Sequence, residues 1–85
     1  GKTPVVDALR FGVRVTGVTV HFVVPGDVDA GPIILQEAIT VDQDDTVETL
    51  SARVHEVEHR LLPLAAEYAT EGRLVVRDGR VFVRT

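Results

Sequence analysis

Residues 17–35 read GVTVHFVVPGDVDAGPIIL, and this stretch decides the fold. In its first part every second residue from Val18 to Val24 is valine or phenylalanine. This alternation predicts a half-buried strand over residues 17–24. Pro25-Gly26-Asp27 then interrupts the pattern and predicts a loop. An almost fully apolar run follows and predicts a second strand over residues 32–42. Consecutive strands usually pair antiparallel, but this loop is longer than the hairpin optimum of about two to five residues, and such long loops often carry function.

A short helix is predicted before this stretch and a hairpin at the end of the chain. Thr3 fits an N-cap and Pro4 a first helical residue, so the helix is expected over residues 4–11. At the other end, Asp78-Gly79 lies between two alternating runs within residues 73–84. An Asp-Gly pair in that setting is the strongest short-range signal for a β-hairpin.

A long helix is predicted between the second strand and the hairpin. Apolar residues recur at spacings of three and four from Val47 to Tyr68, which is typical of a helix with one buried face. Asp45 as N-cap and Glu48 three residues later fit a capping box. Pro63 lies inside the helix and removes a backbone donor, so we expect a kink or break near residues 59–63.

The composition restricts the classes of protein to which the chain can belong. Its 85 residues allow one small domain, and 45% hydrophobic with 26% charged residues indicate a globular chain. A formal net charge of −4 speaks against nucleic acid or an anionic membrane as partner. The absence of cysteine excludes disulfides and thiolate metal sites. The predicted order is α-β-β-α-β-β, which makes the fold class α/β, with an α+β arrangement in this segment.

Asp29 is the first candidate for chemistry. No Lys or Arg lies within seven positions of it, and it sits in the loop between two apolar strands. Such a carboxylate can orient an imidazole and stabilise its cation, as in a Ser-His-Asp triad. The same residue can equally form an Asx-turn, in which its side chain accepts hydrogen bonds from nearby backbone amides. The residue pattern leaves both interpretations open.

Histidines provide the other candidates. His21 lies within the first predicted strand, where it can be a structural residue or an acid–base group near neutral pH. His55 and His59 have the i, i+4 spacing of a two-histidine metal face, but no HExxH motif or third ligand accompanies them, so no metal site is expected. Arg53 and Arg60 are expected to pair with neighbouring glutamates on a solvated helix face.

The order of these motifs resembles the C-terminal part of the phosphoribosylglycinamide formyltransferases (glycinamide ribonucleotide transformylases), within the formyltransferase superfamily. The resemblance rests on residues 15–23, Asp29-Ala30-Gly31-Pro32-Ile33-Ile34-Leu35-Gln36, Arg53-Val54-His55, and Glu58-His59-Arg60-Leu61 with Pro63. It implies a cytoplasmic enzyme of purine biosynthesis that transfers a formyl group from 10-formyltetrahydrofolate to the amine of glycinamide ribonucleotide.

The resemblance also implies roles for individual residues. Asp29 matches the family's catalytic carboxylate, which pairs with a histidine upstream of this chain. The surrounding loop matches the segment that grips the pterin of the folate. His21 matches a supporting histidine near the site. The cofactor-binding positions implied in this way are Val24, Asp27, Val28, Ala30 and Gly31.

The chain departs from the family's pattern in three ways. The loop from His21 to Asp29 is one residue longer than in relatives, and Thr3 stands where relatives often carry a histidine. The Rossmann-like half that binds the nucleotide phosphate has no counterpart here. Residues 1–85 are therefore expected to be one C-terminal segment that does not turn over substrate alone and that needs the N-terminal half as partner.

Two further interpretations remain open at this point. A formyltetrahydrofolate deformylase shares the strand–loop–strand pattern and hydrolyses the same cosubstrate. A non-catalytic small α+β module would fold without any chemistry. The sequence also leaves homo-oligomerisation open.

Overall fold

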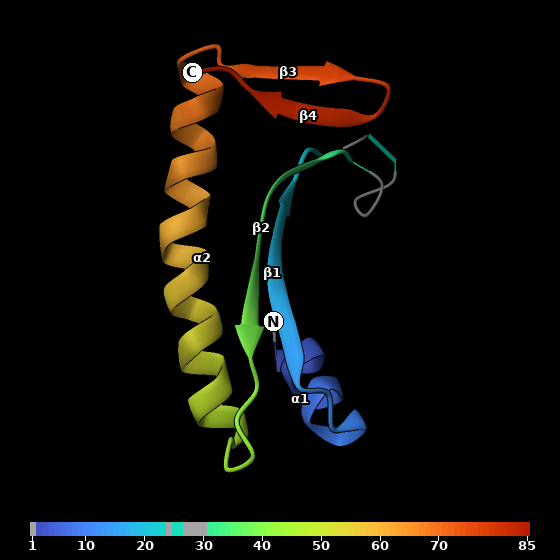
Figure 1. Ribbon diagram of the computed structural model, residues 1–85, viewed down its shortest axis with the longest axis vertical. Coiled ribbons are helices and arrows are strands. Elements are labelled where there is room, and N and C mark those ends of the chain that lie inside the picture. Colours follow the sequence, from blue (N-terminus) through green and yellow to red (C-terminus); the bar gives the residue numbers. More distant parts are fainter. Residues whose placement is uncertain (1, 24, 27–30) are drawn as a thin grey trace. The chain divides into compact units, whose positions relative to one another are not determined.

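The computed structural model describes residues 2–23, 25–26 and 31–85. The order along the described chain is helix α1 (Lys2–Phe11), strands β1 (Val15–His21) and β2 (Ile33–Thr40), helix α2 (Val47–Thr70), and strands β3 (Leu74–Arg77) and β4 (Arg80–Val83). Figure 1 shows these elements, which make a mixed α/β chain as the sequence predicts. The chain divides into two compact units, residues 1–18 with 37–59 and residues 19–36 with 60–85.

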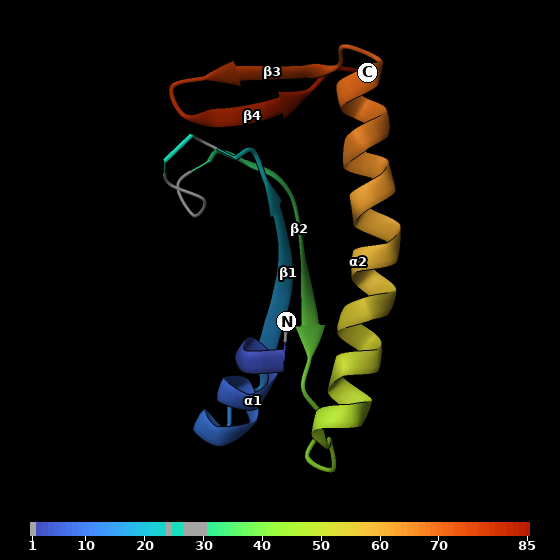
Figure 2. The same cartoon turned by 180° about the vertical axis from the view of Figure 1, so that it is seen from behind.

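β1 and β2 form a two-stranded sheet. The Val41 N–H donates to the Arg14 carbonyl at one end, and the Phe22 N–H donates to the Pro32 carbonyl at the other. The two strands therefore run antiparallel, as their opposed arrows show in Figure 1 and again from behind in Figure 2. β1 starts two residues earlier and ends three residues earlier than the strand predicted over 17–24.

The first unit buries one apolar cluster. Its members come from the helices and strands of that unit: Val5, Ala8, Val18, Ile39, Val41, Leu50 and Val57. The helix α1 begins at Lys2, so Thr3 lies within the first turn and is not the N-cap that the sequence predicts. Val5 and Ala8 are three residues apart, so they lie on the same face of α1, and both are buried.

The N-terminus of α2 is capped one residue later than expected. The Thr46 hydroxyl accepts the Thr49 N–H at 3.2 Å, and the Thr49 hydroxyl accepts the Thr46 N–H at 2.9 Å. This reciprocal pair makes the capping box Thr46–Thr49, and the predicted pair of Asp45 and Glu48 is wrong. Threonine can replace glutamate there because its hydroxyl also accepts a backbone hydrogen bond.

α2 is a single helix from Val47 to Thr70 with Pro63 inside it, so a break does not occur there, and the kink near residues 59–63 stays a prediction. A proline in a helix removes one hydrogen bond of the backbone ladder, and apolar packing on both sides can compensate. Leu61 and Ala65 are both buried and flank Pro63 in the second unit. Neither helix in the described part of the chain has the length and hydropathy that crossing a bilayer requires.

The second unit ends in an antiparallel hairpin of β3 and β4. Its register pairs Leu74 with Val83, Val75 with Phe82, Val76 with Val81 and Arg77 with Arg80. Asp78 and Gly79 make the turn with φ of 51° and 76°. Positive φ at both central residues is the type I′ geometry, which matches the twist of the strands and favours Asp-Gly.

Candidate functional site

The predicted site surrounds the segment between β1 and β2, and the structure describes its two ends. Of the predicted residues, Asp29, Val24, Asp27, Val28 and Ala30 lie outside the described residues. His21 and Gly31 lie within them. The described part of the site consists of the residues where the chain leaves β1 and returns to β2.

Backbone groups bring these two ends together. The Phe22 N–H donates to the Pro32 carbonyl at 2.9 Å. A Cβ placed on Gly31 would lie 1.4 Å from the Phe22 carbonyl oxygen and 2.3 Å from its carbon, so any other residue there would overlap the backbone. We call Phe22, Gly31 and Pro32 the neck. The neck explains physically why glycine precedes proline in this sequence.

His21 is held against the neck. This half-buried side chain lies at the end of β1, and its Nδ1 is 2.7 Å from the Phe22 carbonyl oxygen. A carbonyl oxygen accepts hydrogen bonds only, so Nδ1 carries the proton in this contact. In the neutral ring, Nε2 is then left as an acceptor. The contact ties the imidazole to the same carbonyl that lies against Gly31.

A second contact joins the two strands next to the neck. The Gln36 side-chain amide donates to the Thr19 hydroxyl at 2.8 Å. Sequence reasoning did not select either residue, because a polar pair across two strands leaves no signal until the register is known.

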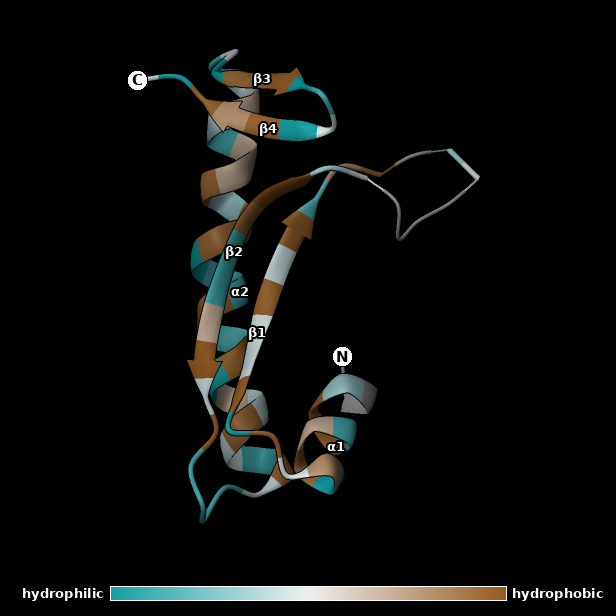
Figure 3. Cartoon of the chain, turned by 45° about the vertical axis from the view of Figure 1, so that its right-hand side comes forward, coloured by the Kyte–Doolittle hydropathy of each residue, from teal (hydrophilic) through white to brown (hydrophobic). Residues whose placement is uncertain are grey.

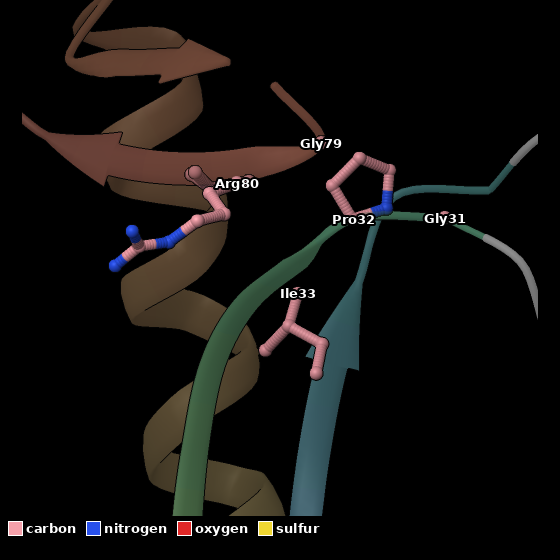
Figure 4. Close-up of a pocket in the computed structure, with 6 residues that line it drawn as sticks. Gly31, Pro32, Ile33, Gly79 and Arg80 are labelled. Carbon is pink, nitrogen blue, oxygen red and sulfur yellow. The ribbon is translucent and has the colours of Figure 1, made fainter. Parts of the chain in front are cut away.

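A pocket of about 490 Å³ opens beside the neck in the second unit. Gly31, Pro32 and Ile33 line it from the neck and β2, and Gly79, Arg80 and Val81 line it from the hairpin. Figure 4 shows that the Arg80 side chain leaves the hairpin with its guanidinium directed away from the Pro32 ring. Arg80 is the one charged residue among the six that line the pocket, and the others are apolar residues or glycines.

The histidines of α2 do not gather ligands. The rings of His55 and His59 meet edge to face with their centroids 6.5 Å apart, and His55 is 72% exposed and lies 3.4 Å from a Glu58 carboxylate oxygen. Within the described ranges, no group of three or more His, Asp or Glu side chains is placed to hold a metal ion.

Arg53 pairs with aspartates, and the predicted pairing with neighbouring glutamates is wrong. Its guanidinium contacts the Asp45 carboxylate, lies 3.9 Å from Asp42 and donates to the Thr40 carbonyl. The hydrogen bond from Arg53, followed by one from the Thr49 hydroxyl, lowers the pKa of Asp45 from 3.8 to about 2. The cluster links the end of β2 to the first turns of α2, and its role is structural.

Comparison with known proteins shows which family the chain matches. The family profile described as Formyl transferase matches residues 1–66. The trifunctional purine biosynthetic protein adenosine-3 of Gallus gallus is 57% identical over 70 residues, which is 82% of this chain and 7% of that protein.

Two crystal structures resemble the chain closely. The glycinamide ribonucleotide transformylase 1 of Symbiobacterium toebii superposes with a TM-score of 0.85 at 49% identity, over 95% of this chain and 38% of the other. A formyltetrahydrofolate deformylase of Pseudomonas syringae pv. tomato superposes with a TM-score of 0.89 at 32% identity, over all of this chain and 28% of the other. The chain thus spans well under half the length of each of these proteins.

Proposed function

The chain belongs to the formyl transferase family, and from this premise we propose that it is the C-terminal part of an enzyme that moves a formyl group from 10-formyltetrahydrofolate to the amine of glycinamide ribonucleotide. The observation that carries the proposal is the match to a solved transformylase at 49% identity over 95% of the chain. The neck supports it, because Phe22, Gly31 and Pro32 close the backbone on either side of the segment that contains Asp29.

The proposed reaction is an acyl transfer. The substrate amine attacks the formyl carbon, a C–N bond forms, the bond from that carbon to the folate nitrogen breaks, and a proton passes to the folate nitrogen. Asp29 is proposed to pair with a histidine of the N-terminal half. A nearby carboxylate raises the pKa of an imidazole and favours its cation, which stabilises the oxyanion that develops during attack.

The described residues have positioning roles in this proposal. The neck fixes where the segment with Asp29 starts and ends. His21 donates from Nδ1 to the Phe22 carbonyl and thereby holds the neck from the β1 side. The apolar walls that Pro32, Ile33 and Val81 give the neighbouring pocket suit an uncharged part of a folate. The reaction as proposed uses folate as cosubstrate and no metal.

Exposed apolar surface supports a larger fold around the chain. Phe11 is 82% exposed, Val15 is 60% exposed, and within the described residues β1 pairs only with β2. A two-stranded sheet with an open apolar edge is marginal in water, so we propose that an N-terminal half covers this edge and supplies the nucleotide site. By itself the 85-residue chain is then inactive.

A deformylase is the second candidate, because the solved deformylase superposes on the whole chain. The test incubates the full-length protein with 10-formyltetrahydrofolate, with and without glycinamide ribonucleotide, and measures formylated nucleotide and free formate. We expect formylated nucleotide. Formate released without the nucleotide would instead establish the deformylase, and no reaction of either kind would favour a non-catalytic module.

A further inference from the structure

Arg77 and Arg80 lie opposite each other next to the turn of the hairpin. They are direct cross-strand partners in the register of β3 and β4, and like charges at such positions destabilise a sheet. Among the residues that the structure describes, neither guanidinium has a carboxylate at ion-pairing distance. The hairpin therefore carries two positive charges that no described residue neutralises.

Phe82 lies on the same face of the hairpin as these arginines. Side chains alternate between the two faces of a strand, so the pair Val75–Phe82 shares the face of the pair Arg77–Arg80. The two guanidinium carbons lie 5.9 and 5.3 Å from the centroid of the Phe82 ring, and this residue is 43% exposed. Cation–π contacts orient a guanidinium but leave its N–H donors and its charge available. Arginine and aromatic residues are enriched at protein–protein interfaces, so these four residues, which we call the cationic face, have the composition of a contact surface.

The other two arginines of this end of the chain are engaged within it. Arg73 lies over the Tyr68 ring at 4.5 Å and pairs with Glu71 at 3.1 Å. Arg84 donates to the Gly72 carbonyl at 3.0 Å. The cationic face thus supplies the available guanidinium groups of the hairpin.

Negative charge gathers between β2 and α2. Asp42, Asp44, Asp45 and Glu48 fall within seven residues of sequence. Arg53 contacts Asp45 and lies 3.9 Å from Asp42. Asp44 and Glu48 are exposed, and among the described residues their carboxylates have no partner. Glu48 is free of a capping role because a threonine pair caps the helix, and we call Asp44 and Glu48 the acidic pair.

The sequence as a whole is divided by charge in the same way. Residues 73–85 hold four of the nine basic residues and one of the thirteen acidic ones, and residues 1–72 hold the other five basic and twelve acidic residues. Figure 3 shows the turn end of the hairpin and the loop between β2 and α2 as hydrophilic. Each copy of the chain therefore presents both a positive and a negative surface, and such surfaces attract each other between copies.

We propose that the cationic face of one copy of this protein binds the acidic pair of a second copy, with Arg77 and Arg80 donating to the carboxylates of Asp44 and Glu48. A guanidinium donates two parallel N–H bonds to a carboxylate, which gives such a contact a defined geometry. A second copy is the occupant because it carries exposed carboxylates without partners, whereas a polyanion is repelled by the net charge of −4. The contact can repeat head to tail or close reciprocally between two copies. It does not depend on the proposed function.

Sedimentation equilibrium of the full-length protein measures this association. Contacts between exposed charges weaken as salt is added, because the screening length falls from about 30 Å at 0.01 M to about 3 Å at 1 M. At up to about 1 mM protein we expect self-association at the low salt concentration, with a Kd that rises at least about tenfold at the high one. A protein that stays monomeric at both salt concentrations, or one whose association does not weaken with salt, would overturn the proposal.

Charge reversal tests the two surfaces separately. Arg77→Glu/Arg80→Glu makes both surfaces negative, and Asp44→Lys/Glu48→Lys makes both positive. Each variant alone should associate at least about tenfold more weakly than the wild type at low salt, since every contact then joins like charges. An equimolar mixture of the two variants should associate again, because each contact between unlike copies joins opposite charges.

A matched variant separates this contact from a general effect of net charge. Glu56→Lys/Glu67→Lys changes the net charge by the same amount as the reversed acidic pair, at two exposed positions of α2. Its Kd should stay within about threefold of that of the wild type. Equal weakening in this control, or a mixture of the two reversed variants that stays monomeric although both have the circular dichroism of the wild type, would contradict the assignment. None of these measurements requires turnover, so the formyl transfer assay tests the proposed function independently.

Discussion

The carbonyl oxygen of Phe22 occupies the place where a side chain on Gly31 would begin. A Cβ built on Gly31 lies 1.4 Å from that oxygen, and the next residue, Pro32, accepts the Phe22 N–H. The two ends of the segment between β1 and β2 are therefore joined by backbone alone. Residue 31 must therefore be glycine because no room is left for a side chain, and not because glycine has a chemical role there.

Replacement of Gly31 by alanine should open the neck. The added methyl cannot avoid the Phe22 backbone, so we expect a loss of about 3 kcal/mol or more in the free energy of unfolding measured in urea. Gly72→Ala is the matched control, because no atom lies within 4 Å of the added Cβ and the cost is only that of φ +67°. That cost is about 1–2 kcal/mol. Equal losses in the two variants would show that the close approach is not present.

The tautomer of His21 is a second prediction. Its Nδ1 donates to the Phe22 carbonyl, so the neutral ring should carry its proton on Nδ1. Long-range ¹H–¹⁵N correlation spectra at alkaline pH measure this directly. An Nε2-protonated ring would contradict the structure.

Two substitutions of His21 test the same contact by stability. The Asn side-chain nitrogen can replace Nδ1, whereas the longer Gln side chain places its nitrogen nearer to Nε2. His21→Asn should keep the hydrogen bond to the Phe22 carbonyl, and His21→Gln should lose about 0.5–1.5 kcal/mol relative to it in the free energy of unfolding.

Asp45 should make the stability of the chain depend on pH in the acid range. Its folded pKa of about 2 lies below the ordinary 3.8, because Arg53 and then Thr49 donate hydrogen bonds to the carboxylate. A depressed folded pKa adds stability that is fully present above the unfolded pKa and disappears as the pH falls through the folded one. Asp45→Asn should therefore lower Tm at pH 7. The difference in Tm between this variant and the wild type should shrink between about pH 4 and pH 2.

The control for this experiment is the neighbouring exposed residue Asp44. Asp44→Asn removes the same charge from the same turn, and its Tm should follow the wild type across the acid range. The difference in Tm between Asp45→Asn and the wild type could instead stay constant from pH 7 to pH 2. That result would show that ionisation of Asp45 does not stabilise the fold.

Local patterns in the sequence predicted much of the fold for clear physical reasons. The alternation before the loop, the apolar spacing of the long helix and the Asp78-Gly79 turn act over a few residues, so they can be interpreted without the tertiary structure. The mixed α/β class followed from them. The neck could not be predicted from such local patterns, because only the fold reveals that Gly31 lies against Phe22.

The errors have a common cause in competing partners. Asp45 has the right spacing to Glu48 for a capping box, but in the fold it lies within reach of Arg53, and Thr46 with Thr49 caps the helix. Asp29 was selected by its isolation from basic residues and by family resemblance, and its role remains a prediction.

The most direct measurement of the central claim is the kcat of Asp29→Asn in the full-length protein, with glycinamide ribonucleotide and 10-formyltetrahydrofolate as substrates. Loss of the carboxylate that supports the imidazole cation should lower kcat by at least about a hundredfold, with much less effect on the KM of the nucleotide. Asp7→Asn, which removes an exposed carboxylate from α1, should keep the kcat of the wild type. A kcat of Asp29→Asn close to that of the wild type would contradict the assignment.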